Sequence, residues 1–151
     1  MRYTKVFVAT VVVVVGVSLA LAAFSLAAVK PKSTVWTAAL TSGKEVPAQV
    51  VKNANAHGLF KGTLTGSTLH WKLTFAKLTG PATMAHIHMA AAGKPGGVVV
   101  TLCAVSCASG TTGTATISPA LKTAFRKHLL YVNVHTAKNP NGEIRGQLAS
   151  G

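Results

Sequence analysis

The stretch "HGLFKGTLTGSTLHWKLTF", residues 57–75, decides the fold class, because apolar and polar residues alternate on both sides of a turn. Its second half places four apolar side chains on one face: Leu69, Trp71, Leu73 and Phe75. The polar residues between them face the other way, which is the period-two pattern of a half-buried strand. Phe60 and Leu64 continue the pattern in the first half, and Gly66 and Ser67 suit a tight turn. The stretch therefore predicts an antiparallel hairpin.

Six further segments have the same strand character: residues 34–41, 83–89, 97–102, 113–118, 129–136 and 142–149. One helix is indicated within residues 118–128, "SPALKTAFRKH", because Ser118 can cap it and Pro119 can occupy its first turn. Leu121 and Phe125 would then face the sheet. These elements predict an all-β fold, an antiparallel Greek-key-like β-sandwich or barrel of about eight short strands with one short helix.

An apolar N-terminal segment precedes these elements. A cationic start, "MRYTK", leads into an uninterrupted apolar run from Val6 to Val29. We predict that residues 1–29 are a signal peptide or an N-terminal membrane anchor. Small residues from Ser25 to Ala27 favour cleavage near Ala27, whereas the length of the run is sufficient to span a bilayer. In both cases residues 34–149 form an exported domain, secreted or anchored to the outer face of the cytoplasmic membrane.

The chain is strongly basic. It has 15 Lys and Arg residues against two acidic residues, Glu45 and Glu143, and a formal net charge of +13. Such a domain is attracted to polyanions, which outside a cell are anionic envelope polymers or lipid headgroups. Adaptation to an acidic exterior is the alternative explanation. The cations are scattered and no basic run is interleaved with aromatic residues, which argues against a nucleic-acid partner.

Cys103 and Cys107 are the only cysteines. They flank a short loop, "CAVSC", and a disulfide is expected between them in an oxidising compartment. The alternative is a two-thiolate metal site, which would need further ligands nearby. A disulfide that closes so small a ring would shape a loop rather than hold the fold together.

Three histidines are candidate metal ligands. In "TMAHIHM", His86 and His88 share one face of a strand with Met84, and Ala85 and Ile87 face the opposite way. In "LLYVNVHT", the last histidine, His135, likewise opposes the apolar face. If both apolar faces point into the core, all three imidazoles lie on outer or rim-facing surfaces. Two imidazoles at i and i+2, joined by a third, could bind copper or zinc; the alternative is that all three are structural.

The motifs that carry these residues resemble the CHRD domain, named from chordin and widespread in exported bacterial proteins. They occur in the order of the family: E-V-P at Glu45–Pro47, A-H-I-H at Ala85–His88, V-N-V-H-T at Val132–Thr136 and G-E-I-R-G at Gly142–Gly146. One departure is Met89, where the family commonly has glycine. The resemblance extends from about Trp36 to Leu148 and implies an extracellular β-sandwich module that supports interaction with other macromolecules.

Both carboxylates fall inside these motifs, and Glu143 has two interpretations. It could be an exposed cross-strand partner of Arg145 or a lysine. It could instead lie beside His135 across the last hairpin and accept a proton from its ring, which would orient a ligand imidazole. Asn133 and Arg145 are likewise expected to lie next to the histidines and to support them.

A weaker likeness concerns the chemistry of the histidines. The H-x-H pair and the distant His135 look like the copper site of the copper/zinc superoxide dismutase β-sandwich. The chain lacks an aspartate for a zinc subsite and a clear bridging histidine. His57, His70 and His128 are further candidates for a fourth ligand, without a motif around them.

The sequence thus favours an exported, non-enzymatic binding or interaction module for an unknown extracellular macromolecule. The alternative is a metal-binding domain with copper or zinc as cofactor and superoxide dismutase-like redox activity. Attachment to anionic envelope polymers or lipid headgroups is compatible with either. No paired carboxylates, nucleophile elbow or phosphate-binding glycine loop is present in the sequence, so no catalytic residue is assigned.

Overall fold

The computed structural model describes residues 31–151. The predicted signal peptide or anchor, residues 1–29, lies outside this range. Among the described helices, none is long and apolar enough to cross a membrane. The elements in chain order are β1 (Ser33–Thr41), the 3₁₀ helix η1 (Ser42–Lys44), β2 (His57–Thr65), β3 (Thr68–Ala76), β4 (Ala82–Met89), β5 (Gly97–Cys103), β6 (Thr112–Thr116), α1 (Pro119–Arg126), β7 (Leu130–Thr136), β8 (Ile144–Gln147) and β9 (Ala149–Ser150).

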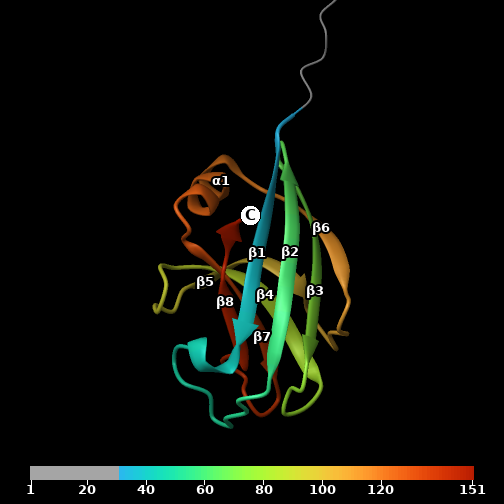
Figure 1. The fold of residues 1–151 in the computed structure, drawn as a ribbon, viewed down its shortest axis with the longest axis vertical. Coiled ribbons are helices and arrows are strands. Elements are labelled where there is room, and N and C mark those ends of the chain that lie inside the picture. The colour runs from blue at the N-terminus through green and yellow to red at the C-terminus, as the bar shows by residue number, and fades with distance from the viewer. Residues whose placement is uncertain (1–30) are drawn as a thin grey trace, which may run out of the picture.

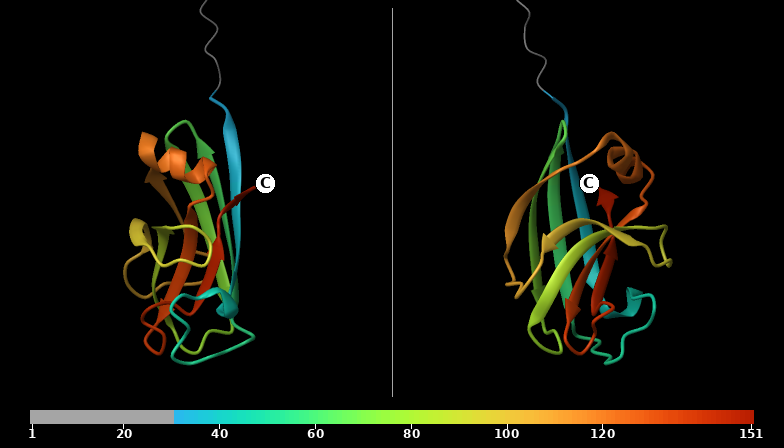
Figure 2. Two further views of the ribbon diagram at one scale, coloured as in Figure 1. Left: turned by 90° about the vertical axis from the view of Figure 1, so that its left-hand side faces the viewer. Right: turned by 180° about the vertical axis from the view of Figure 1, so that it is seen from behind.

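The strands form one antiparallel sheet that curls into a nearly closed barrel (Figures 1 and 2). The strand order is β5-β4-β7-β8-β1-β2-β3-β6, and the short β9 also pairs with β1. The connections from β3 to β4, from β5 to β6 and, through α1, from β6 to β7 cross between the two halves of this order. The predicted all-β antiparallel class with one helix is confirmed, and of the two predicted architectures the sheet forms the barrel.

The β2–β3 hairpin forms as predicted from residues 57–75. Leu69 and Leu73 are fully buried and Trp71 is nearly so, whereas the residues between them face solvent. Gly66 has a φ of +60° at the turn, a conformation that glycine adopts without steric cost. Because β8 pairs with β1, the hairpin belongs to the same continuous sheet as β4 and β7. These two strands carry His86, His88 and His135 and lie beyond β8 in the strand order.

The helix α1 closes one end of the barrel (Figure 1). The Ser118 hydroxyl accepts a hydrogen bond from the Leu121 amide at 3.2 Å, which caps the helix as predicted. Phe125 is buried, and its ring centroid lies 5.0 Å from that of Trp36 on β1. The helix therefore fixes the start of β7 relative to the barrel.

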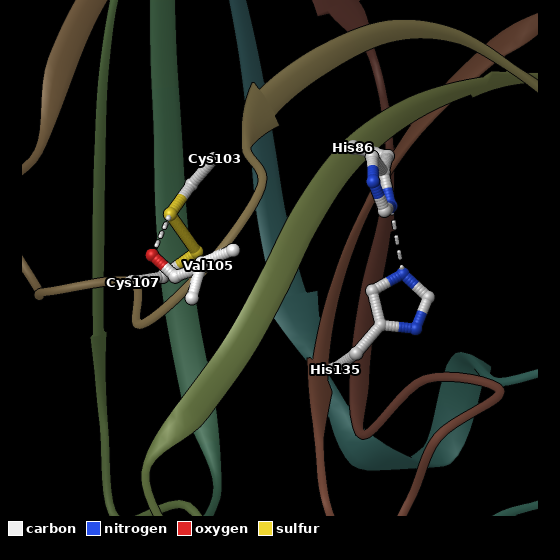
Figure 3. The surroundings of a disulfide bond; sticks show 5 residues. All are labelled: His86, Cys103, Val105, Cys107 and His135. Carbon is white, nitrogen blue, oxygen red and sulfur yellow. Dashed lines mark hydrogen bonds between the residues drawn. A yellow bond between two sulfur atoms is a disulfide. The ribbon is translucent and has the colours of Figure 1, made fainter.

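Cys103 and Cys107 form the predicted disulfide, which excludes the two-thiolate metal site (Figure 3). The bond ties the end of β5 to the loop that follows it. The Cys107 amide donates to the Ala82 carbonyl at 2.9 Å, so that the loop is also held to the start of β4.

Candidate metal centre

Strands β4 and β7 present the three histidines on the face that turns away from the core. Ala85 and Ile87 point inward and are fully buried, which confirms the predicted phase of β4. The outer face, however, is not a free surface, because His88 is only 9% exposed and His135 only 6%. Loops before β5 and around η1, together with the β7–β8 turn, cover it.

We call this covered face the polar layer. The strand register explains its composition: His88 lies opposite Tyr131, and His86 opposite Asn133. On the next strand, Asn133 pairs with Arg145 and Tyr131 with Gln147. Its members, in strand order, are His86, His88, Tyr131, Asn133, His135, Arg145 and Gln147. Polar side chains from three neighbouring strands are thus collected beneath loops.

The three histidines converge within the polar layer. One potential ligand nitrogen from each lies within 4.8 Å of the others. His86 Nδ1 is 3.1 Å from His135 Nε2 (Figure 3). His57, His70 and His128, considered as sources of a fourth ligand, are all exposed and are not members of this cluster.

Backbone carbonyls set the orientation of two of the rings. His88 Nδ1 lies 2.9 Å from the Gly96 carbonyl, and His135 Nδ1 lies 2.9 Å from the Pro140 carbonyl. Because a carbonyl oxygen only accepts, each Nδ1 carries the proton and each Nε2 keeps its lone pair. His88 Nε2 is buried and has no hydrogen-bond partner among the described residues. Hydrogen bonds of this type orient metal-binding imidazoles in other proteins.

The surroundings favour the neutral, metal-binding form of all three rings. Burial lowers the pKa of His135 to about 4, despite the opposing hydrogen bond to Pro140, and the other two histidines add to the effect. Burial likewise lowers the pKa of His86, with a further contribution from His88. For His88, burial lowers the pKa more than the Gly96 bond raises it. Metal binding at neutral pH would therefore not have to displace protons from three imidazolium ions.

The expected contact between Glu143 and His135 does not form. Glu143 is fully buried, and its carboxylate accepts hydrogen bonds from the Thr79 amide, the Thr79 hydroxyl and the Thr136 hydroxyl, each at 2.6 Å. His135 uses the Pro140 carbonyl instead. Burial alone would raise the pKa of Glu143, but these hydrogen bonds lower it below its usual value. Both predicted roles of Glu143 are wrong: it is neither exposed nor a partner of the imidazole, and it anchors the Thr79 loop to β7.

Arg145 and His88 both contact the ring of Tyr131. The Arg145 guanidinium carbon lies 3.4 Å from the centroid of the Tyr131 ring, and the His88 ring stacks on the same tyrosine at 4.9 Å. The Tyr131 hydroxyl accepts a hydrogen bond from the Gly96 amide at 3.1 Å, which fixes the loop that holds His88. Sequence reasoning assigned no role to Tyr131, although its i, i+2 spacing to Asn133 places it on the same face of β7 as the polar layer.

Two of the remaining family-motif residues, Glu45 and Gly142, pack against Asn133. Its side-chain amide donates to Glu45 Oε2 at 3.0 Å, which brings the η1 segment over β7. Gly142 has a φ of +132°, and a Cβ there would lie 2.4 Å from Asn133 Nδ2. A Cβ on Gly146 would lie 2.4 Å from the Ala39 carbonyl oxygen of β1. Neighbouring atoms therefore leave no room for a side chain at either glycine. Pro47 is exposed and follows a cis peptide bond.

Comparison with known proteins gives one family. No curated protein and no solved structure matches the chain. The model of the CHRD domain matches residues 36–148, a range that includes β1, the histidine strands and the whole polar layer. By this match, the chain belongs to the CHRD domain family.

Proposed function

We propose that this CHRD domain binds one copper or zinc ion through His86, His88 and His135. The observation that carries the proposal is the convergence of three imidazole nitrogens within 4.8 Å. Two further features support it. The unpaired His88 Nε2 is a buried polar atom whose desolvation no hydrogen bond offsets. The Gly96 and Pro140 carbonyls hold two rings with the proton on Nδ1, so that neither Nε2 is protonated; that of His135 accepts a hydrogen bond from His86 Nδ1, which a metal ion would replace.

Three imidazoles suit either ion. A tetrahedral ion with three protein ligands keeps one position for water or another small ligand, and His86, the half-buried member, lies on the accessible side of the cluster. With copper, the site would supply a one-electron redox centre. Superoxide dismutase-like activity is therefore part of the proposal to be tested, and it is secondary to binding.

The test is metal content of the tag-free protein. The protein is equilibrated with copper or zinc, freed of loosely bound metal by gel filtration and analysed by mass spectrometry. The variant combines His86→Ala, His88→Ala and His135→Ala, and the matched control is His70→Ala, which removes an exposed histidine from β3. We expect one ion per chain in the wild type and the control, and loss of it in the triple variant. Equal metal content in the triple variant and the control would show that the ion is bound elsewhere.

A second proposal follows from the distribution of charge. Both acidic side chains, Glu45 and Glu143, are buried, whereas most of the described lysines are exposed. The accessible side-chain charge of the described domain is therefore cationic. We propose that the domain is an exported interaction module that attaches to anionic envelope polymers or lipid headgroups.

Cosedimentation with anionic and neutral vesicles tests this attachment across a salt series. The Debye length, over which salt screens a charge, falls from about 10 Å at 0.1 M to about 3 Å at 1 M ionic strength. We expect binding to anionic vesicles that declines steeply over this range, and none to neutral vesicles. Association that persists at high salt would argue against electrostatic attachment and for a specific protein contact.

A further inference from the structure

A pocket distinct from the histidine cluster lies beside the polar layer. It has a volume of about 380 Å³ and lies between the η1 segment and the loop before β5, and its walls include Gly43, Lys44, Glu45, Gly93 and Arg145. In the left view of Figure 2, these two loops lie in front of the red strands of the barrel. None of the three clustered histidines lines the pocket. Its size is within the range of small-molecule sites.

The guanidinium of Arg145 is the unusual feature of this pocket. Arg145 is only 2% exposed, and its Nη2 donates to the Lys94 carbonyl at 2.7 Å. Its Nη1 is buried and has no hydrogen-bond partner among the described residues. A buried, permanently charged donor without an acceptor is costly, and guanidinium groups are suited to bind the oxygens of carboxylate or phosphate.

A second buried group at the pocket also lacks a partner. Glu45 Oε2 accepts from Asn133, but Glu45 Oε1 has no hydrogen bond among the described residues. Burial raises the pKa of Glu45 to about 8, against the smaller opposing effects of Asn133 and Arg145. The carboxyl is therefore mostly protonated at neutral pH, and Oε1 can donate. With Lys44 also lining the pocket, a ligand would meet donors and positive charge.

We propose that this pocket binds the oxyanion group of a small molecule, a carboxylate or a phosphate, with Arg145 as the principal donor and Glu45 and Lys44 as the supporting groups. The ligand supplies acceptor oxygens to two residues of the pocket wall that each keep a buried polar atom without a partner, Arg145 and Glu45. The pocket is separate from the proposed metal site, because the two share no lining residue. It is also distinct from attachment to polymers, because its principal donor, Arg145, is buried.

The test uses the ¹⁵N-labelled full chain, freed of metal on a chelating resin so that no carboxylate chelator competes. Succinate and inorganic phosphate are titrated separately at constant ionic strength, and the amide signals of Gly43 and Gly93 and the Arg145 side-chain signal are followed. We expect saturable shifts with at least one of the two anions. Saturation with succinate alone assigns a carboxylate, with phosphate alone a phosphate, and with both a general oxyanion site.

Three variants distinguish anion binding at this pocket from nonspecific electrostatic attraction of anions to the basic domain. Arg145→Lys keeps the charge but loses the planar fork, and we expect the affinity to fall about tenfold or more, as for a lost charge-assisted hydrogen bond. Lys44→Gln serves as the second variant should Arg145→Lys fail to fold, with a smaller loss expected. Lys61→Gln removes an exposed cation outside the pocket and should leave the affinity unchanged. Non-saturating shifts with both anions, or an equal loss in Lys61→Gln and the pocket variants, would overturn the proposal.

Discussion

Replacing Glu45 with glutamine should remove one contribution to the pH dependence of stability between pH 6.5 and pH 8. The Glu45 carboxyl is buried in the folded domain, where its pKa is raised from 4.5 to about 8. Over most of this window the folded state holds a proton that the unfolded state has released. The contribution of Glu45 to the free energy of unfolding therefore falls as pH rises, because deprotonation favours the unfolded chain.

The magnitude follows from the size of the window. One proton of difference corresponds to about 1.4 kcal/mol per pH unit, and because the folded carboxyl is half ionised at pH 8, the contribution of Glu45 changes by about 1.6 kcal/mol between pH 6.5 and pH 8. The clustered histidines oppose this change. The pKa of His135 is lowered from 6.5 to about 4, and burial lowers those of His86 and His88 as well, so the stability that these rings contribute is complete only well above pH 6.5 and is lost as pH falls. Because the histidines are the same in the wild type and in Glu45→Gln, the difference in unfolding free energy between the two proteins isolates Glu45.

The assay is urea unfolding of metal-free protein at several pH values between 6.5 and 8, followed by the fluorescence of the buried Trp36 and Trp71. Glu45→Gln retains an oxygen that can accept the Asn133 hydrogen bond, and the unfolding free energy of the wild type minus that of the variant should fall by about 1.6 kcal/mol across the window. The matched control is Glu143→Gln. The pKa of Glu143 is lowered, so this residue is ionised in both states above pH 6.5 and its variant should keep the wild-type slope. A difference between the wild type and Glu45→Gln that does not change with pH would refute the reasoning.

Three variants test structural features outside the histidine cluster by the same unfolding assay. Replacing Cys103 and Cys107 together by serine should lower the unfolding free energy by about 2 kcal/mol, because the disulfide closes a very short loop. Gly142→Ala should cost roughly 1–3 kcal/mol, since its Cβ would clash with Asn133 at a positive φ; Gly43→Ala, with no atom within 4 Å, is its control and should be neutral. Ser118→Ala should cost about 1 kcal/mol through the lost helix cap, and no loss would mean that the cap is replaced by solvent.

The periodic parts of the sequence predicted the fold well, for a local reason. In β3 and β4 each side chain is directed by its position in the strand, so alternation reveals which face is buried. The hairpin at Gly66 and the capped helix at Ser118 also depend on neighbouring residues alone. The sequence could not choose between sandwich and barrel, because closure depends on the pairing of β8 with β1, which are far apart in the chain.

The convergence of the three histidines was predictable from the sequence, whereas the residues that hold them in place were not. The i, i+2 spacing placed His86 and His88 together, and the phase of β7 added His135. The role of Glu143 was mistaken because its carboxylate is directed by Thr79, a residue in a distant loop that no strand pattern identifies. The carbonyls that orient His88 and His135 also escaped notice, since any residue type supplies a carbonyl at Gly96 or Pro140.

The polar layer is poorly explained by stability alone. In the described chain, buried side-chain atoms without a hydrogen-bond partner occur at six residues, and four of these belong to or contact the layer: Glu45, His88, Asn133 and Arg145. Each such atom costs about 1–3 kcal/mol if it stays unpaired, which is a large fraction of the 5–15 kcal/mol by which domains of this kind are stable. Apolar residues at the same positions would avoid this cost. Two of these atoms would gain a partner from the proposed ligands: His88 Nε2 from a metal ion and Arg145 Nη1 from an oxyanion. The Tyr131 ring contacts both side chains. Two neighbouring ligands on one covered face would also explain why three separate loops close over strands that would otherwise face solvent.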